Sequence, residues 1–89
     1  KGIDYTVRLH WREFQFAVGQ NRFSVDVVGL TTVNVFAQLE PRVQFGLNEI
    51  GIASATVQAD ANAQIKIQLI PVVGYGDNAS INGIEIFPA

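Results

Sequence analysis

A glycine-punctuated stretch near the end of the chain, Gly74-Tyr75-Gly76-Asp77-Asn78-Ala79, carries the residue types best suited to ligand chemistry. Tyr75 offers a ring face for stacking, while Asp77 and Asn78 offer hydrogen-bond acceptors and a donor. A sugar presents an apolar ring face and a fringe of hydroxyl groups, so this combination suits carbohydrate recognition. The alternative is an ordinary loop, in which glycine and asparagine adopt positive φ angles and aspartate caps a turn.

The same stretch matches the dinucleotide-binding pattern G-x-G-x-x-G/A on paper. That pattern works only where a helix follows the glycines, because the N-terminus of the helix holds the pyrophosphate. Here the alternating pattern of a strand follows, from Ser80 to Phe87. The sequence therefore argues against nucleotide binding.

Residues for catalysis are few. His10 is the only histidine, shares one face of a predicted strand with Arg8 and Arg12, and has no acidic residue near it in the sequence. We interpret it as a solvated strand residue. None of the three serines has a nucleophile-elbow context, and the absence of cysteine excludes disulfides, thiol catalysis and cysteine-ligated metals. The sequence predicts a non-catalytic domain with neither a metal nor a cofactor.

The first long stretch, Ile3 to Val28, organises the predicted fold. Apolar and polar residues alternate from Tyr5 to Trp11, which predicts a half-buried strand. Two polar residues then come in succession at Arg12-Glu13. The apolar positions change from odd to even numbers at Phe14 and Phe16, as they would after the extra residue of a β-bulge. Gly19-Gln20-Asn21 has turn chemistry, and a second alternation begins at Phe23. We interpret the stretch as a hairpin whose bulged strand re-aims Phe14 to Phe16.

The rest of the chain predicts further strands and little helix. Arg42 to Gly51 is ambiguous and is interpreted as strand fragments or irregular loop, and a helical turn within the alanine-rich Ala53 to Ala63 is the one helical alternative. A turn is expected at Asp60 to Ala63. The expected strands are Leu30 to Phe36, closed by Leu39-Glu40-Pro41; Ile52 to Ala59; Ile65 to Leu69, ended by Pro71; and Ser80 to Phe87, with Gly83 a candidate bulge or point of close approach. Six or seven short strands predict an all-β, antiparallel two-layer β-sandwich of jelly-roll type.

Composition limits the possible partners. Eighty-nine residues make a single domain, 1–89, and 48% apolar residues with a net charge of −2 are typical of a globular chain. The six lysines and arginines are scattered, which argues against a nucleic-acid surface, and no apolar run approaches the roughly 20 residues of a membrane span. The chain begins at Lys1, within what looks like the start of a strand, so we expect it to be part of a longer polypeptide.

Three blocks of the sequence form one set in order and spacing: Tyr5-Thr6-Val7-Arg8-Leu9-His10-Trp11-Arg12-Glu13-Phe14-Gln15-Phe16, Asn21-Arg22-Phe23-Ser24-Val25-Asp26-Val27 and Gly76-Asp77-Asn78-Ala79-Ser80-Ile81-Asn82-Gly83-Ile84-Glu85-Ile86. Together they resemble the malectin and malectin-like family. Gln15 stands at the position of a tyrosine in that family, and Phe16 and Asp77 match, by position, an adjacent phenylalanine and an aspartate that contact ligand there. The resemblance covers nearly the whole chain, which looks like the C-terminal half to two-thirds of such a domain. It implies a β-sandwich that binds neutral glucose-type oligosaccharides through loops at one end.

These observations predict a carbohydrate-binding module of a larger protein that is secreted, on the cell surface or in the secretory-pathway lumen. Phe16 and Tyr75 would stack on a sugar ring, and Gln15, Asp77 and Asn78 would bind its hydroxyl groups. The expected partners are an oligosaccharide or polysaccharide and the rest of the parent polypeptide, with no nucleic acid and no membrane insertion. The alternative is a structural or protein-contact β-sandwich without a ligand, and catalysis comes third.

Overall fold

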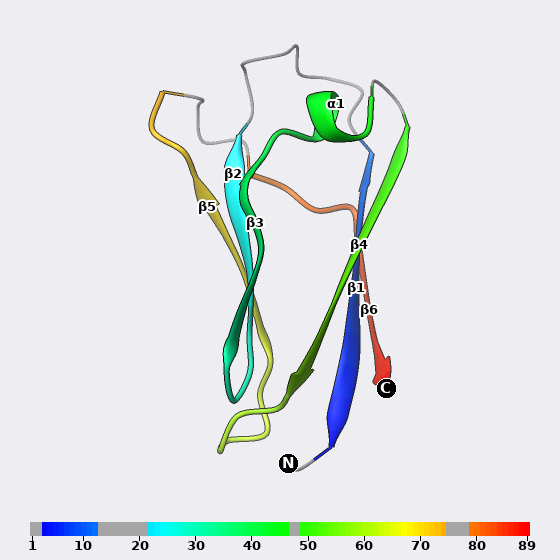
Figure 1. Cartoon of the computed structure of the whole chain (residues 1–89), viewed down its shortest axis with the longest axis vertical. Coiled ribbons are helices and arrows are strands. Elements are labelled where there is room, and N and C mark those ends of the chain that lie inside the picture. Colours follow the sequence, from blue (N-terminus) through cyan, green and yellow to red (C-terminus); the bar gives the residue numbers. More distant parts are fainter. Residues whose placement is uncertain (1–2, 13–21, 47–48, 75–78) are drawn as a thin grey trace.

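The chain forms two antiparallel three-stranded sheets that pack face to face, as a computed structural model shows (Figure 1). The structure describes residues 3–12, 22–46, 49–74 and 79–89. One sheet has the strand order β4-β1-β6 and the other β3-β2-β5. The predicted antiparallel β-sandwich is confirmed. Its elements are β1 (Asp4–Arg12), β2 (Phe23–Val28), β3 (Thr32–Leu39), α1 (Pro41–Gln44), β4 (Ile50–Gln58), β5 (Lys66–Pro71) and β6 (Gly83–Pro88).

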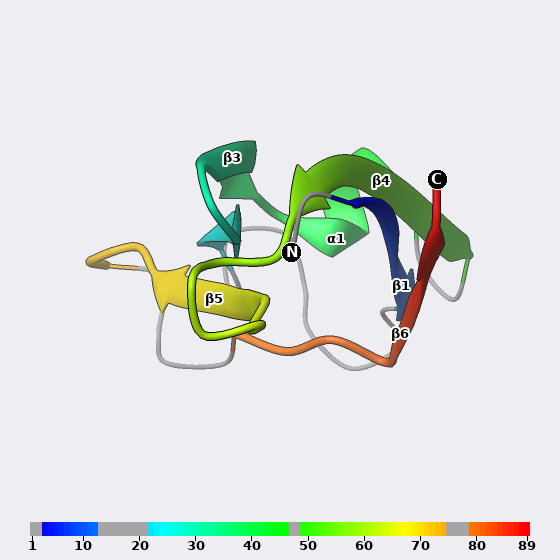
Figure 2. The same cartoon turned by 90° about the horizontal axis from the view of Figure 1, so that it is seen from below.

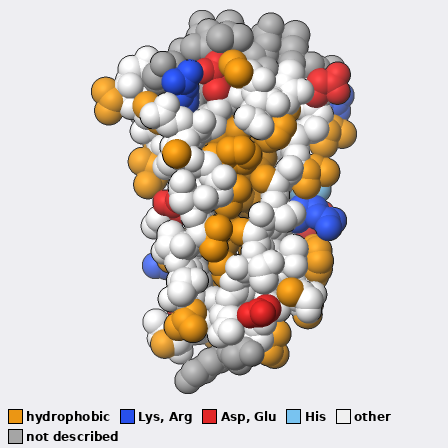
Figure 3. All heavy atoms as spheres, in the orientation of Figure 1, with side chains coloured by type: hydrophobic (Ala, Val, Ile, Leu, Met, Phe, Trp, Pro, Cys, Tyr) orange, Lys and Arg blue, Asp and Glu red, His pale blue; other side chains and the backbone are white. Residues whose placement is uncertain are grey.

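The hydrophobic core lies between the sheets, where the alternation of the sequence places it. Val7, Leu9 and Trp11 of β1 are buried, and the residues between them lie on the outer face. β2 repeats the pattern with every second residue from Phe23 to Val27 fully buried. Figure 3 shows apolar side chains running along the seam between the sheets on the side of β3 and β4. Both predicted faces are confirmed.

The predicted hairpin between the first two strands is wrong. β1 pairs with β4 and β6, whereas β2 pairs with β3 and β5, so the two strands are the centres of different sheets. Alternation indicates which face of a strand is buried. Two strands that pair in one sheet and two strands that face each other across a core show the same alternation, so it does not indicate which strands pair. The predicted bulge at Arg12-Glu13 and the turn at Gly19-Gln20-Asn21 involve residues 13–21, which lie outside the described part of the chain.

A single helical turn, α1, replaces part of the strand fragments expected over Arg42 to Gly51. The backbone C=O of Glu40 accepts hydrogen bonds from the N–H groups of Val43 and Gln44 at 3.0 and 2.9 Å. Pro41 suits the first helical position because its missing N–H would have no partner there, and Gly46 follows the turn with a φ of 100°. The prediction of strand fragments or irregular loop is therefore wrong at α1. The helical alternative over Ala53 to Ala63 is wrong as well, because β4 runs through Gln58.

The two sheets meet closely where the β2–β3 turn reaches the end of β4. The N–H of Leu30 donates to the C=O of Gln58 at 2.8 Å. A Cβ atom on Gly29 would lie 2.0 Å from the same carbonyl oxygen, so only glycine permits this approach. The small buried side chains of Ala55 and Ala59 allow the sheets to pack closely on this side.

Turns and edges complete the sandwich. The predicted turn at Asp60 to Ala63 is confirmed, since the Asp60 carboxylate accepts the N–H groups of Asn62 and Gln64 at 2.8 and 2.9 Å. β6 begins at Gly83 and not at Ser80. A Cβ atom on Gly83 would lie 3.6 Å from the Cβ of His10, an ordinary contact, so close approach does not require glycine there.

Candidate functional site

The residues predicted to contact a ligand, Gln15, Phe16, Tyr75, Asp77 and Asn78, all lie outside the described part of the chain. The structure instead describes the residues on either side of the two segments that contain them, and these flanking residues contribute to the candidate site.

The described residues that flank these two segments lie toward the end of the sandwich that carries α1 (Figure 1). The N–H of Val72 donates to the C=O of Arg22 at 2.9 Å, which joins the start of one segment to the end of the other. The indole N–H of Trp11 donates to the C=O of Ser80 at 2.7 Å, which joins their remaining ends. Residues far apart in the sequence therefore lead into the same end of the fold.

Arg22 and Glu40 form an ion pair at this end of the sandwich. Arg22 Nη2 lies 3.0 Å from Glu40 Oε1, and Arg22 Nη1 donates to Gln38 Oε1 at 3.2 Å. The Glu40 side chain is only 4% exposed, and the Arg22 side chain is 31% exposed. A carboxylate is rarely buried unless it is paired, so Arg22 holds Glu40 in a fixed position while keeping one side toward solvent.

The same residues line a hollow of about 280 Å³ at the surface. Its wall consists of Arg22, Gln38, Glu40, Val43 and Gln44. A guanidinium offers donors in a planar fork, a carboxylate offers acceptors, and amides offer both. The hollow can therefore hydrogen-bond a neutral polyhydroxyl compound, and it has an apolar contact in Val43.

The register of the sheet brings this polar set together. Phe23 of β2 pairs with Leu39 of β3, so the neighbouring residues Arg22 and Glu40 come side by side at the ends of these strands. Sequence reasoning missed the pair because the β2–β3 register shifts twice between Phe23 and Asp26. The only signal of this pair in the sequence was Glu40, a charged residue between the apolar Leu39 and Pro41. Strand alternation alone does not indicate which residue would pair with it.

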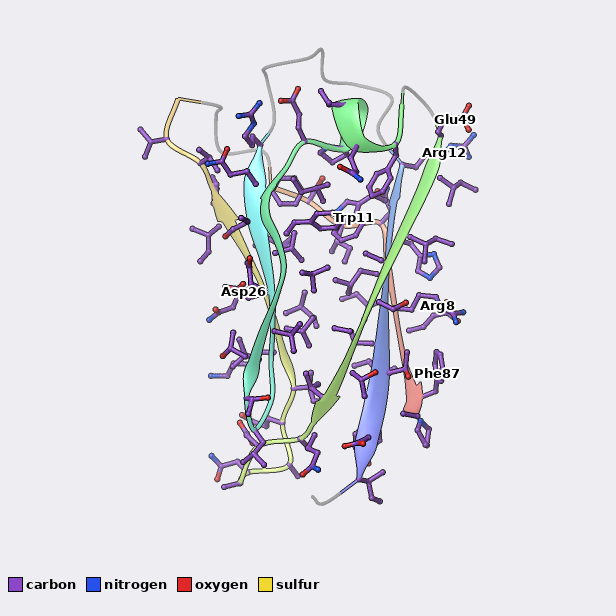
Figure 4. The ribbon with its side chains drawn as sticks, viewed as in Figure 1. Arg8, Trp11, Arg12, Asp26, Glu49 and Phe87 are labelled. Atoms are coloured by element: carbon purple, nitrogen blue, oxygen red, sulfur yellow. The ribbon has the colours of Figure 1, made fainter. Side chains whose placement is uncertain are left out.

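An aromatic cluster supports this end from inside. The ring centroids of Trp11 lie 6.0 Å from those of Phe36 and Phe45, and those of Phe36 and Phe45 lie 6.4 Å apart. Figure 4 shows Trp11 reaching into the space between the sheets. At 1% exposure, Trp11 cannot stack on a ligand, so the cluster positions α1 and its neighbours instead.

A second polar cluster lies on the outer face of the β4-β1-β6 sheet. His10 Nε2 lies 2.7 Å from Glu85 Oε1, and Arg8 Nη1 lies 3.8 Å from the same oxygen. Arg8 also covers the ring of Phe87, with its Cζ 5.2 Å from the centroid (Figure 4). His10 does face outward, as predicted, but the carboxylate partner was missed because β6 contributes it from 75 residues away. About half of the Glu85 side chain is exposed, so water screens the cluster.

Within the described ranges, no group of three or more His, Cys, Asp or Glu side chains could hold a metal ion. No helix in that part of the chain is long and apolar enough to cross a membrane. Comparisons of the chain with family models, curated proteins and solved structures find no match.

Proposed function

We propose that the chain is a non-catalytic carbohydrate-binding module that recognises neutral glucose-type glycans as part of a larger secreted or surface protein. The single observation that supports this most is the ion pair of the buried Glu40 with the partly exposed Arg22 beside a hollow, at the end of the sandwich where the residues that flank both predicted ligand-contacting segments lie. Sugar-binding sites need such preorganised planar polar groups, because each hydroxyl contact must replace a contact with water.

In this proposal, different residues contact the ring face of the sugar and its hydroxyl groups. Phe16 and Tyr75 stack on the pyranose ring, and Gln15, Asp77 and Asn78 bind hydroxyl groups, as the sequence predicts. The polar wall of the hollow extends the hydrogen-bonding surface through Arg22, Gln38 and Glu40. Each hydrogen bond contributes about 1 kcal/mol net, so the dissociation constant for one monosaccharide is expected to be about millimolar.

The test is NMR titration of the isotope-labelled chain with neutral glucose oligosaccharides, together with retention on an immobilised glucan. Asp77→Ala is expected to abolish retention without unfolding the domain, because it removes a predicted hydroxyl acceptor. Asp4→Ala, an exposed aspartate at the opposite end of the sandwich, is the matched control and should bind as the wild type does. Equal retention by the wild type and Asp77→Ala would defeat the proposal.

The second candidate is a structural or protein-contact domain without a ligand. The observation that favours it is the exposure of large aliphatic side chains on strands, among them Ile52, Ile84 and Ile86. A glycan array separates the two candidates. Binding to a neutral glucan supports carbohydrate recognition, and no binding to any neutral or acidic glycan supports the contact domain.

A further inference from the structure

β6 buries its inner face far less than β1, although the two strands are paired in one sheet. Ile84 and Ile86 pair with Leu9 and Val7, so all four side chains point to the same side of the sheet. Leu9 and Val7 are 0% exposed, whereas Ile84 and Ile86 are 47% and 49% exposed. The apolar layer that covers β1 therefore does not extend over β6.

The cause is visible when the molecule is viewed along its long axis. Figure 2 shows that the two sheets approach each other at β3 and β4 and diverge toward β5 and β6. Residues 79–82, which lead into β6, cross the space between the diverging sheets and cover part of it (Figure 2). Ala79 and Ile81 in this segment pack on the core. Beyond it, a hollow of about 260 Å³ stays open and is lined by Tyr5, Ala59, Ala63, Ile65 and Ile86.

The backbone of β6 also has one edge that pairs with no other strand among the described residues. β6 is an outer strand of its sheet, and the N–H of Ala89 donates to the C=O of Asp4 at 2.9 Å. In an antiparallel pair, hydrogen-bonding groups point alternately toward and away from the partner. The N–H and C=O groups of Ile84 and Ile86 therefore point away from β1, and no turn or loop among the described residues bonds to them.

We propose that this edge accepts an added β-strand from a partner polypeptide. The fitting segment is extended, carries aliphatic side chains at alternate positions, and places a lysine or arginine opposite Glu85. Its backbone bonds to Ile84 and Ile86, and its aliphatic side chains fill the opening between Ile86 and Ile65. Its basic residue meets the half-exposed Glu85 carboxylate on the outer face, from the side opposite to the contacts of Glu85 with Arg8 and His10 of β1.

The charge on β6 argues against a second copy of this chain as the occupant. A two-fold antiparallel pairing that uses both Ile84 and Ile86 centres on Glu85, which lies between them. Two Glu85 carboxylates would then be directly opposite each other, and like charges in that position destabilise a sheet. Pro88 further shortens the edge, because it has no N–H to offer.

The experiment uses the full chain and three synthetic peptides with blocked ends. The first, Thr-Val-Thr-Val-Lys-Val-Thr-Val, has the proposed chemistry; the second replaces lysine with glutamate; the third has N-methyl groups along one backbone edge. NMR titration and amide hydrogen exchange are measured for each. The lysine peptide is expected to shift β6 resonances and to protect the Ile84 and Ile86 amides. Both other peptides should bind at least about tenfold more weakly.

A variant of the protein tests the same edge of β6. Ile86→Pro removes one outward N–H without removing a bond to β1, and it should abolish binding of the lysine peptide. If this variant does not fold, the N-methylated peptide still tests the edge. Three results would overturn the proposal: no β6 shifts with the lysine peptide, equal binding of the N-methylated peptide, or Ile84 and Ile86 amides protected by dimerisation of the chain alone.

Discussion

Gly51→Ala should destabilise the α1 end of the sandwich through a single steric conflict. A Cβ atom on Gly51 would lie 2.1 Å from Cδ2 of Phe45, well inside van der Waals contact. Phe45 stacks on Trp11 with an interplanar angle of 19°, so the ring must leave that position or the strand must shift. Overpacking of this kind costs about 1–3 kcal/mol, and replacing a strand glycine returns about 0.5–1 kcal/mol. We expect a net loss of about 1 kcal/mol in the free energy of unfolding.

A double-mutant cycle with Phe45→Ala isolates the conflict. Phe45 is half-buried, so its truncation should cost about 2 kcal/mol, roughly half the value for a fully buried ring. In the double variant the clash is gone, so the total cost should stay near 2 kcal/mol or fall slightly below it. Independent effects would instead sum to about 3 kcal/mol.

The assay is urea unfolding followed by the fluorescence of Trp11, the only tryptophan of the chain. Gly83→Ala is the matched control, because a Cβ atom there meets only ordinary contacts with His10. It should leave stability unchanged or raise it slightly. Additivity of Gly51→Ala and Phe45→Ala within about 0.5 kcal/mol would refute the reasoning, since it would mean that the ring and the new methyl group do not meet.

Three further variants, two at the α1 end and one in the exposed cluster of Glu85, test the polar contacts. Glu40→Ala should lower the free energy of unfolding by about 2 kcal/mol, which is less than for a fully buried pair because Arg22 is partly solvated. Glu85→Ala, in the exposed cluster, should lower it by less than about 0.5 kcal/mol in the same denaturation assay. Trp11→Phe should cost about 2 kcal/mol and increase hydrogen exchange near Ser80, because the Ser80 C=O loses its indole donor. Equal costs for Glu40→Ala and Glu85→Ala, or unchanged exchange near Ser80, would contradict these expectations.

Sequence reasoning was most successful where one side of a strand faces the core. The alternation from Tyr5 to Trp11 and from Phe23 to Val27 predicted which side chains are buried, because a period of two leaves a strand no other way to bury its apolar set. The turn at Asp60 was predictable for a similar reason, since its carboxylate bonds to backbone groups only two and four residues away.

Sequence reasoning failed where one local pattern is compatible with two arrangements. The hairpin prediction failed because β1 and β2 have the same alternation as paired strands but lie in opposite sheets. α1 was missed because its four residues are too few to show a helical period, and its stability comes from the contacts of Phe45 with Trp11 and from the bonds to Glu40.

The amino-acid sequence by itself determined the fold class, the inner and outer faces of the strands, and the absence of thiol chemistry, because each depends on residue type and short-range spacing. Only the tertiary structure decided which strands are neighbours, and with them the pairs Arg22–Glu40 and His10–Glu85, whose members are 18 and 75 residues apart. It also decided that β6 stays half-covered. Pairing and coverage depend on how the sheets are stacked, and many stackings satisfy the same alternation.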